Sequence, residues 1–210
     1  MTTSSTRPRR GRPPRVPRDD PDTRAALIRA GTEVLTEQGF TASGIDGILK
    51  RVGVPKGSFY YYFDSKEAFG RAVMEHYGAY FARKLDRHLL DTSLPPLARI
   101  EAFVADARAG MARHGFKRGC LVGNLGHEAA GLPESYREWL LATLESWRRR
   151  LARCLREAQA AGQLDAAADC DTLAEAFWIG WEGAVMRARL VGDAAPLDTF
   201  ITTYMSGLPR

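Results

Sequence analysis

The sequence of 210 residues contains no run of about 18 uninterrupted apolar residues, so it predicts no transmembrane span and no membrane partner. Its N-terminus lacks the hydrophobic segment of a secretory signal peptide. Three cysteines, Cys120, Cys154 and Cys170, form no CxxC pair, and their odd number and spacing fit neither a disulfide framework nor a zinc site. These absences favour a protein of the reducing cytoplasm that binds no metal.

Sequence signatures of the common enzyme classes are also missing, among them GxxxxGK[ST], HExxH, GxSxG and GxGxxG. Cys120 and His127 would share a helix face as a nucleophile–base pair. Seven residues at a rise of about 1.5 Å separate them by roughly 10.5 Å, which exceeds any hydrogen-bond distance. The sequence therefore predicts no enzyme and no cofactor.

Acidic residues are absent from the first 18 positions, which contain six arginines. Subtracting this +6 from the net charge of +5 leaves −1 for the other 192 residues. Residues 1–20 are rich in Arg and Pro and have almost nothing to bury, so they predict a disordered arm. The basic character belongs to this arm and not to the folded part of the chain.

Strand-like alternation is missing, whereas apolar residues recur with helical spacing from about residue 21 to the end. Short breaks rich in Pro and Gly separate these periodic runs. The pattern predicts an all-α protein of about nine helices. We expect an N-terminal three-helix unit at 21–66, followed by a helical domain at 67–210.

The stretch 45–63, IDGILKRVGVPKGSFYYYF, predicts a helix-turn-helix. A short helix from about 44 to 52 stops at Gly53, and Pro55 opens a second short helix at 56–63. Three consecutive tyrosines cannot all face inward, because neighbours on a helix are about 100° apart. An ordinary helical hairpin with surface tyrosines is the alternative.

The segments QGF at 38–40, residues 45–53 and VPKGSFYYYFDSKEAF at 54–69 resemble the N-terminal DNA-binding domain of TetR/AcrR-family repressors. The resemblance implies a homodimer that binds a palindromic double-stranded DNA operator, with each recognition helix in a major groove. Implied contacts to bases or the groove are Lys56, Gly57, Ser58 and Tyr61; implied phosphate contacts are Tyr60, Tyr62 and Lys66; Ser43 starts the supporting helix.

The segments RGCLVGNLGHE at 118–128 and EAFWIGWEGA at 175–184 resemble an acrylate-responsive branch of the same family. The resemblance implies that 67–210 binds a small effector, acrylate or a related electrophile, and dimerises through helices at about 171–190 and 196–207. Three glycines within 118–128 predict close packing or a cavity, since each costs a helix about 1 kcal/mol. The candidate effector residues are Cys120, Asn124, Tyr77, Phe116, Trp178 and Trp181.

Two readings of Cys120 stay open. It precedes a predicted helix whose dipole would lower the thiol pKa, as a sensor of electrophiles needs, or it is a buried small hydrophobe. Glu182 is either an acid in the effector cavity or a salt-bridged surface group. The alternative functions are a constitutive DNA-binding regulator without covalent sensing, and a regulator of an efflux or reductase gene with a different effector.

The arm generates a first prediction. Deletion of residues 1–18 removes six cations that can neutralise phosphates, so operator affinity should fall and its dependence on salt should flatten. A fluorescence-anisotropy titration across a salt series measures both effects. Identical salt slopes for the full and the shortened chain would remove the arm from DNA binding.

Overall fold

The computed structural model describes residues 21–210, and the predicted arm at 1–20 lies outside this range. All regular structure in the described range is helical, which confirms the all-α prediction. The α-helices are α1 (Pro21–Gln38), α2 (Ile45–Val52), α3 (Phe59–Tyr62), α4 (Lys66–Leu89), α5 (Pro96–Arg113), α6 (Leu121–His127), α7 (Glu134–Ala160), α8 (Cys170–Val191) and α9 (Ala195–Ser206), with two 3-10 turns, η1 (Lys56–Ser58) and η2 (Ala129–Gly131).

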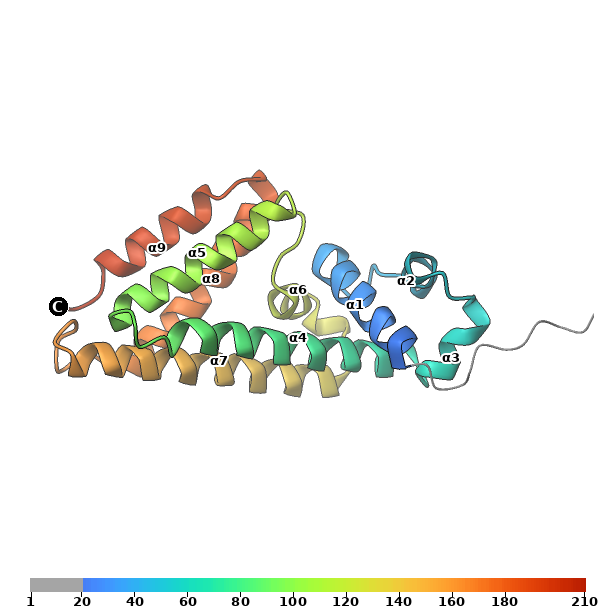
Figure 1. Cartoon of the computed structure of the whole chain (residues 1–210), viewed down its shortest axis with the longest axis horizontal. Coiled ribbons are helices and arrows are strands. Elements are labelled where there is room, and N and C mark those ends of the chain that lie inside the picture. Colours follow the sequence, from blue (N-terminus) through green and yellow to red (C-terminus); the bar gives the residue numbers. More distant parts are fainter. Residues whose placement is uncertain (1–20) are drawn as a thin grey trace, which may run out of the picture.

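The helices form a small N-terminal unit and a larger body (Figure 1). Helices α1, α2 and α3 gather at one end, while α4 and α7 run side by side along the molecule. Helices α5, α8 and α9 cover the opposite end, and the short α6 lies between the body and α1. No helix within residues 21–210 is both long and apolar enough to cross a membrane.

Aromatic side chains from four helices form the centre of the body. The ring of Phe81 on α4 lies 4.3 Å from that of Trp147 on α7, and Trp147 lies 5.0 Å from Trp178 on α8. Phe103 on α5 packs edge-on against Phe81 and Trp178. Aromatic pairs of this kind stabilise a core beyond the area they bury, so this cluster holds the body around the middle of α4.

Side-chain caps define where α4 and α8 begin. Ser65 accepts a hydrogen bond from the Ala68 amide at 2.9 Å and thereby starts α4. Asp169 caps α8 in the same way, by accepting from the amides of Asp171 and Thr172.

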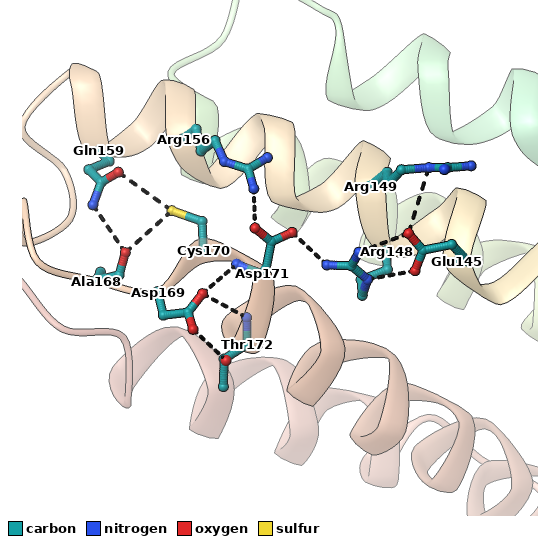
Figure 2. Close-up of polar contacts among 10 residues, drawn as sticks. All are labelled: Glu145, Arg148, Arg149, Arg156, Gln159, Ala168, Asp169, Cys170, Asp171 and Thr172. Carbon is teal, nitrogen blue, oxygen red and sulfur yellow. Dashed lines mark hydrogen bonds and ion pairs between the residues drawn. The ribbon is translucent and has the colours of Figure 1, made fainter.

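Ion pairs then join α8 to α7 (Figure 2). The carboxylate of Asp171 binds Arg148 at 2.5 Å and also pairs with Arg156. Cys170 lies beside Gln159 in this cluster, and Cys154 is buried against the Pro96 carbonyl oxygen. Both thiols are therefore buried parts of the packing between helices.

The second helix of the predicted helix-turn-helix differs from expectation in one respect. The predicted single helix over 56–63 is a 3-10 turn over Lys56–Ser58 followed by one turn of α-helix, α3. The Ser58 amide donates to the Pro55 carbonyl oxygen at 2.9 Å, the i to i+3 bond of a 3-10 turn. Gly57 and Ser58 are weak helix formers, which favours this tighter start.

Candidate nucleic-acid interface and effector cavity

The helix-turn-helix has its own apolar interior. Ile48 and Leu49 of α2 are buried, together with Phe59 and Phe63 of the second helix. Gly53 ends α2 at a φ of 72°, a backbone conformation that favours glycine, and its amide caps the helix. These contacts fix the angle between the two helices and leave the opposite face of α3 toward solvent.

That face carries most of the predicted DNA contacts. The exposed fractions of Tyr60 and Tyr61 are 68% and 39%, and Tyr62 is half-buried. Lys56 is exposed and pairs with Asp46 at 2.9 Å. A Cβ atom at Gly57 would meet nothing within 4 Å, so the fold itself does not require a glycine there. The missing side chain leaves the backbone of the turn accessible from outside.

Two predicted DNA contacts lie elsewhere. Ser43 is buried, and its hydroxyl donates to the Phe40 carbonyl oxygen at 2.8 Å. The Lys66 ammonium donates to the same oxygen at 2.9 Å and lies 4.5 Å from the centre of the Phe40 ring. Both side chains therefore stabilise the turn between α1 and α2, and a DNA contact by either stays a prediction.

A cavity of about 220 Å³ lies where α1, α4, α5 and α8 meet the segment that precedes α6. Three of the six predicted effector residues line it: Tyr77, Cys120 and Trp181. The remaining lining residues are Thr32, Glu33, Thr36, Tyr80, Phe81, Lys84, Ala107, Gly110, Met111, Arg113, His114, Arg118, Gly119 and Val185.

The other three predicted effector residues do not line this cavity. Trp178 belongs to the aromatic core, where its Nε1 is buried without a hydrogen-bond partner in the described chain. Phe116 follows Gly115 in a turn with positive φ and packs against the core from outside. Asn124 points toward α1, as described below. The residue types suited the lining of a cavity, but the path of the chain places these three side chains away from it.

Cys120 directly precedes α6 and is buried, with only 7% of its surface exposed. The Tyr77 hydroxyl donates to its Sγ at 3.6 Å. Burial raises the pKa of the thiol well above its usual value, and the nearby charge of Glu182 raises it further. The prediction of a lowered pKa is therefore wrong, because desolvation outweighs the dipole of a seven-residue helix.

Glu182 of α8 completes this cluster. It forms no ion pair with any residue of 21–210, and its Oε1 is buried without a partner. A Cβ atom at Gly123 would lie 2.1 Å from Glu182 Oε2 and 3.7 Å from the Cβ of Cys120, so the carboxyl group reaches the thiol only because position 123 is glycine. Burial raises the pKa of Glu182 to about 7. The missing ion pair argues against the surface salt bridge, but Glu182 does not line the cavity, so an acid in the effector cavity stays a prediction.

The glycine-rich segment also makes a second close approach. A Cβ atom at Gly119 would lie 2.5 Å from Cδ of Arg189, whereas one at Gly126 would meet nothing within 4 Å. Two of the three glycines thus serve the predicted close packing.

The end of α1 is held by side chains of α6 and α8, an arrangement that we call the α1 clamp. Asn124 donates to the carbonyl oxygens of Leu35 and Thr36 at 3.2 and 2.9 Å. Arg189 donates to Asn124 Oδ1 at 2.8 Å and to the Glu37 carbonyl oxygen at 2.7 Å. Leu35 also accepts from the Gly39 amide and Thr36 from the Gly119 amide, so the clamp adds side-chain donors to the carbonyls at the end of the helix.

Glu128, directly after α6, holds the turn that follows α1. Its carboxylate accepts from the amides of Phe40 and Thr41 at 3.0 and 2.7 Å, and from the Thr41 hydroxyl at 2.7 Å. Gly39 has a φ of 79°, and a Cβ there would lie 1.8 Å from Glu128 Oε1. The segment that continues from Cys120 is therefore bonded, from the middle of α6 and from directly after it, to the unit that carries the helix-turn-helix.

A helix-turn-helix unit bonded to a larger helical body with a cavity is the layout of a transcription regulator. Residues 27–73 match the family described as bacterial regulatory proteins, tetR family, and residues 96–204 match the tetracyclin repressor-like C-terminal domain. The chain belongs to the TetR family. Members are transcriptional regulators and not enzymes, which confirms that prediction.

Three proteins are similar to this chain over most of its length. The transcriptional regulator AcuR of Cereibacter sphaeroides is 56% identical over 94% of this chain and 90% of its own length. The repressor DhaR of a Mycobacterium species is 33% identical over 88% and 91%. A crystal structure of regulatory protein TetR from Rhodobacter sphaeroides superposes with a TM-score of 0.86 at 55% identity, covering 89% of this chain and 98% of that one.

The buried acid generates a second prediction. An acid with a raised pKa favours folding only while it is protonated, so its contribution is complete below about pH 4.5 and is lost as the pH rises to about 7. Between pH 5 and 7.5 the unfolding free energy of the wild type should fall by about 2.4 kcal/mol relative to Glu182→Gln. Urea unfolding across this range measures the difference.

The exposed Glu175→Gln on the same helix is the control, and its pH profile should parallel that of the wild type. Parallel profiles for Glu182→Gln and the wild type would contradict the assignment of a buried, raised acid.

Proposed function

We propose that the protein is a transcriptional repressor that binds a palindromic DNA operator as a homodimer and is released by a small effector, acrylate or a related electrophile. One observation carries the proposal: the cavity wall at Cys120 is continuous with α6, and α6 is bonded through the α1 clamp to the helix-turn-helix unit. The similarity to AcuR, DhaR and their family supports the same function.

The DNA-facing surface is the outer face of η1 and α3. Lys56, Gly57, Ser58 and Tyr61 are proposed to face the groove, with Tyr60 and Tyr62 at phosphates, as expected from the sequence. Two such helices in a dimer must reach successive major grooves about 34–36 Å apart, which is why the operator should be palindromic.

The dimer is proposed to form through α8 and α9. Ile179, Met186 and Leu190 follow one another at helical spacing on α8 with exposed fractions of 69%, 39% and 78%. Gly183 lies in the same row, and a Cβ there would meet nothing within 4 Å. An apolar row around an open glycine position fits close contact with the same row of a second copy.

Release of the operator by the effector is proposed to begin at Cys120. In a covalent reaction the sulfur bonds to the β-carbon of an activated alkene, and the thiol proton ends on the α-carbon. Glu182 lies beside the thiol with a pKa of about 7, so near neutral pH it can take up and pass on this proton. The product enlarges the first residue before α6, which shifts the helix and loosens the α1 clamp.

One observation favours a second mode of sensing. Burial raises the pKa of the Cys120 thiol, and a protonated thiol is a weak nucleophile. In this mode Cys120 and Tyr77 are parts of the cavity wall, and the effector binds reversibly between them.

The third prediction tests function and mode together. Acrylate should raise the dissociation constant for the protein's own upstream DNA by at least about 5-fold, the lower range of allosteric coupling. Cys120→Ser should abolish this response if sensing is covalent, and mass spectrometry of the intact chain should show one added acrylate in the wild type. Gel-shift titration measures the release.

Cys170→Ser is the matched control, since Cys170 is buried away from the cavity. Full release of Cys120→Ser by acrylate would establish the reversible mode. Operator binding that no concentration of acrylate alters would refute acrylate as the effector, and absence of operator binding would refute the repressor.

The fourth prediction tests the dimer face. Replacing Ile179 and Leu190 together by Arg would bury unpaired charges between the two copies, at a cost of several kcal/mol. The double variant should be monomeric by light scattering and should lose at least about 100-fold in operator affinity. Leu141→Arg, at an equally exposed site on α7, is the control and should stay dimeric. A dimeric double variant would place the interface elsewhere.

A further inference from the structure

We propose that the cavity has a cationic end, formed by Lys84 and Arg113, that binds an anionic group of the effector. The inferred ligand class is an apolar or unsaturated chain that carries a carboxylate or phosphate several carbons away from the part facing Cys120. This inference rests on the proposed function only in taking the cavity as the effector site.

Lys84 is nine-tenths buried and still lines the cavity. Its ammonium lies 3.2 Å from the carboxylate of Asp106. Asp106 also pairs with Arg87 at 2.8 Å and bonds His88 at 2.9 Å. A single carboxylate thus serves three basic side chains, and the charge of Lys84 is only partly compensated.

Arg113 adds a second cation at the same place. A Cβ atom at Gly110 would lie 3.6 Å from Nη2 of Arg113 and 4.0 Å from Nζ of Lys84, so these nitrogens are at most 7.6 Å apart. Arg113 forms no ion pair with any residue of 21–210. The missing side chain at Gly110 leaves space between two cations, into which an anion fits with donors on both sides.

The charges on the other walls do not compensate this end. From α1, Glu33 faces the cavity, but Arg118 binds it at 3.2 Å and Arg51 binds it at 3.5 Å. Arg118 is also engaged by Glu37 at 3.0 Å. The α1 side is therefore internally paired, and the excess positive charge lies at Lys84 and Arg113. His114 lines the cavity beside them.

The helix geometry sets the length of the ligand. Tyr77, which contacts Cys120, and Lys84 are both on α4, seven residues apart, which corresponds to about 10 Å along the axis. Apolar side chains that also line the cavity are those of Phe81, Met111 and Trp181. A three-carbon acid reaches one end only, whereas a chain of about six carbons with an anionic head spans both ends.

The test uses probes that differ only in the head group. Isothermal titration calorimetry of the full chain should give at least about 10-fold tighter binding of hexanoate and hexyl phosphate than of neutral hexanamide, the range expected for one charge-assisted pair. Comparison of hexanoate with hexyl phosphate shows which anion the site prefers. Arg113→Gln should remove most of this advantage and leave hexanamide binding unchanged.

Arg87→Gln is the matched control. It also removes one positive charge, but Arg87 pairs with Asp106 and does not line the cavity. Lys84→Met provides a second variant from the other side of the anion. Equal affinities for hexanoate and hexanamide, or equal effects of Arg113→Gln and Arg87→Gln, would overturn the cationic end.

Operator release separates this inference from the proposed function. Release by neutral acrylamide, together with anion affinities no better than that of hexanamide, would overturn the inference alone. Anion binding that depends on Arg113, in a protein that no probe releases from DNA, would overturn the proposed function and establish an anion site of another purpose.

Discussion

The hydrogen bonds at the carbonyl end of α1 join the N-terminal unit to the helical body. The carbonyls there accept hydrogen bonds from outside the helix, among them those from the amide of Asn124 and the guanidinium of Arg189. Glu128 holds the turn that follows. Since these donors and acceptors belong to α6 and α8, a shift of either helix must break, move or strain a bond to the DNA-binding unit.

Burial controls the chemistry at the other end of α6. Water is excluded from Cys120 and Glu182, so both groups favour their neutral forms, and their pKa values rise together. A thiol whose pKa is raised is a weak nucleophile near neutral pH. The same cavity ends in cations at Lys84 and Arg113, which gives it an apolar middle and two polar ends.

Local sequence patterns predicted the parts of the site that depend on neighbouring residues. The helix-turn-helix and the close packing at Gly119 and Gly123 were predicted from residues one to four positions apart. Asn124, Phe116 and Trp178 do not line the cavity, because the direction of a side chain depends on how the chain folds in space. Burial of Lys84 gave no signal, since basic residues on a helix usually face solvent.

The sequence by itself determined that the described chain is helical, where the recognition turn lies and that the family is one of DNA-binding regulators. Helix periodicity, caps and turn residues act over a single turn, so they can be read along the chain. Only the tertiary structure decided that burial raises the pKa of the Cys120 thiol, that the carboxyl group of Glu182 lies beside it and that Asn124 belongs to the clamp. Asn124 bonds a carbonyl 89 residues away, and burial depends on the whole fold, so neither leaves a mark in any short stretch of sequence.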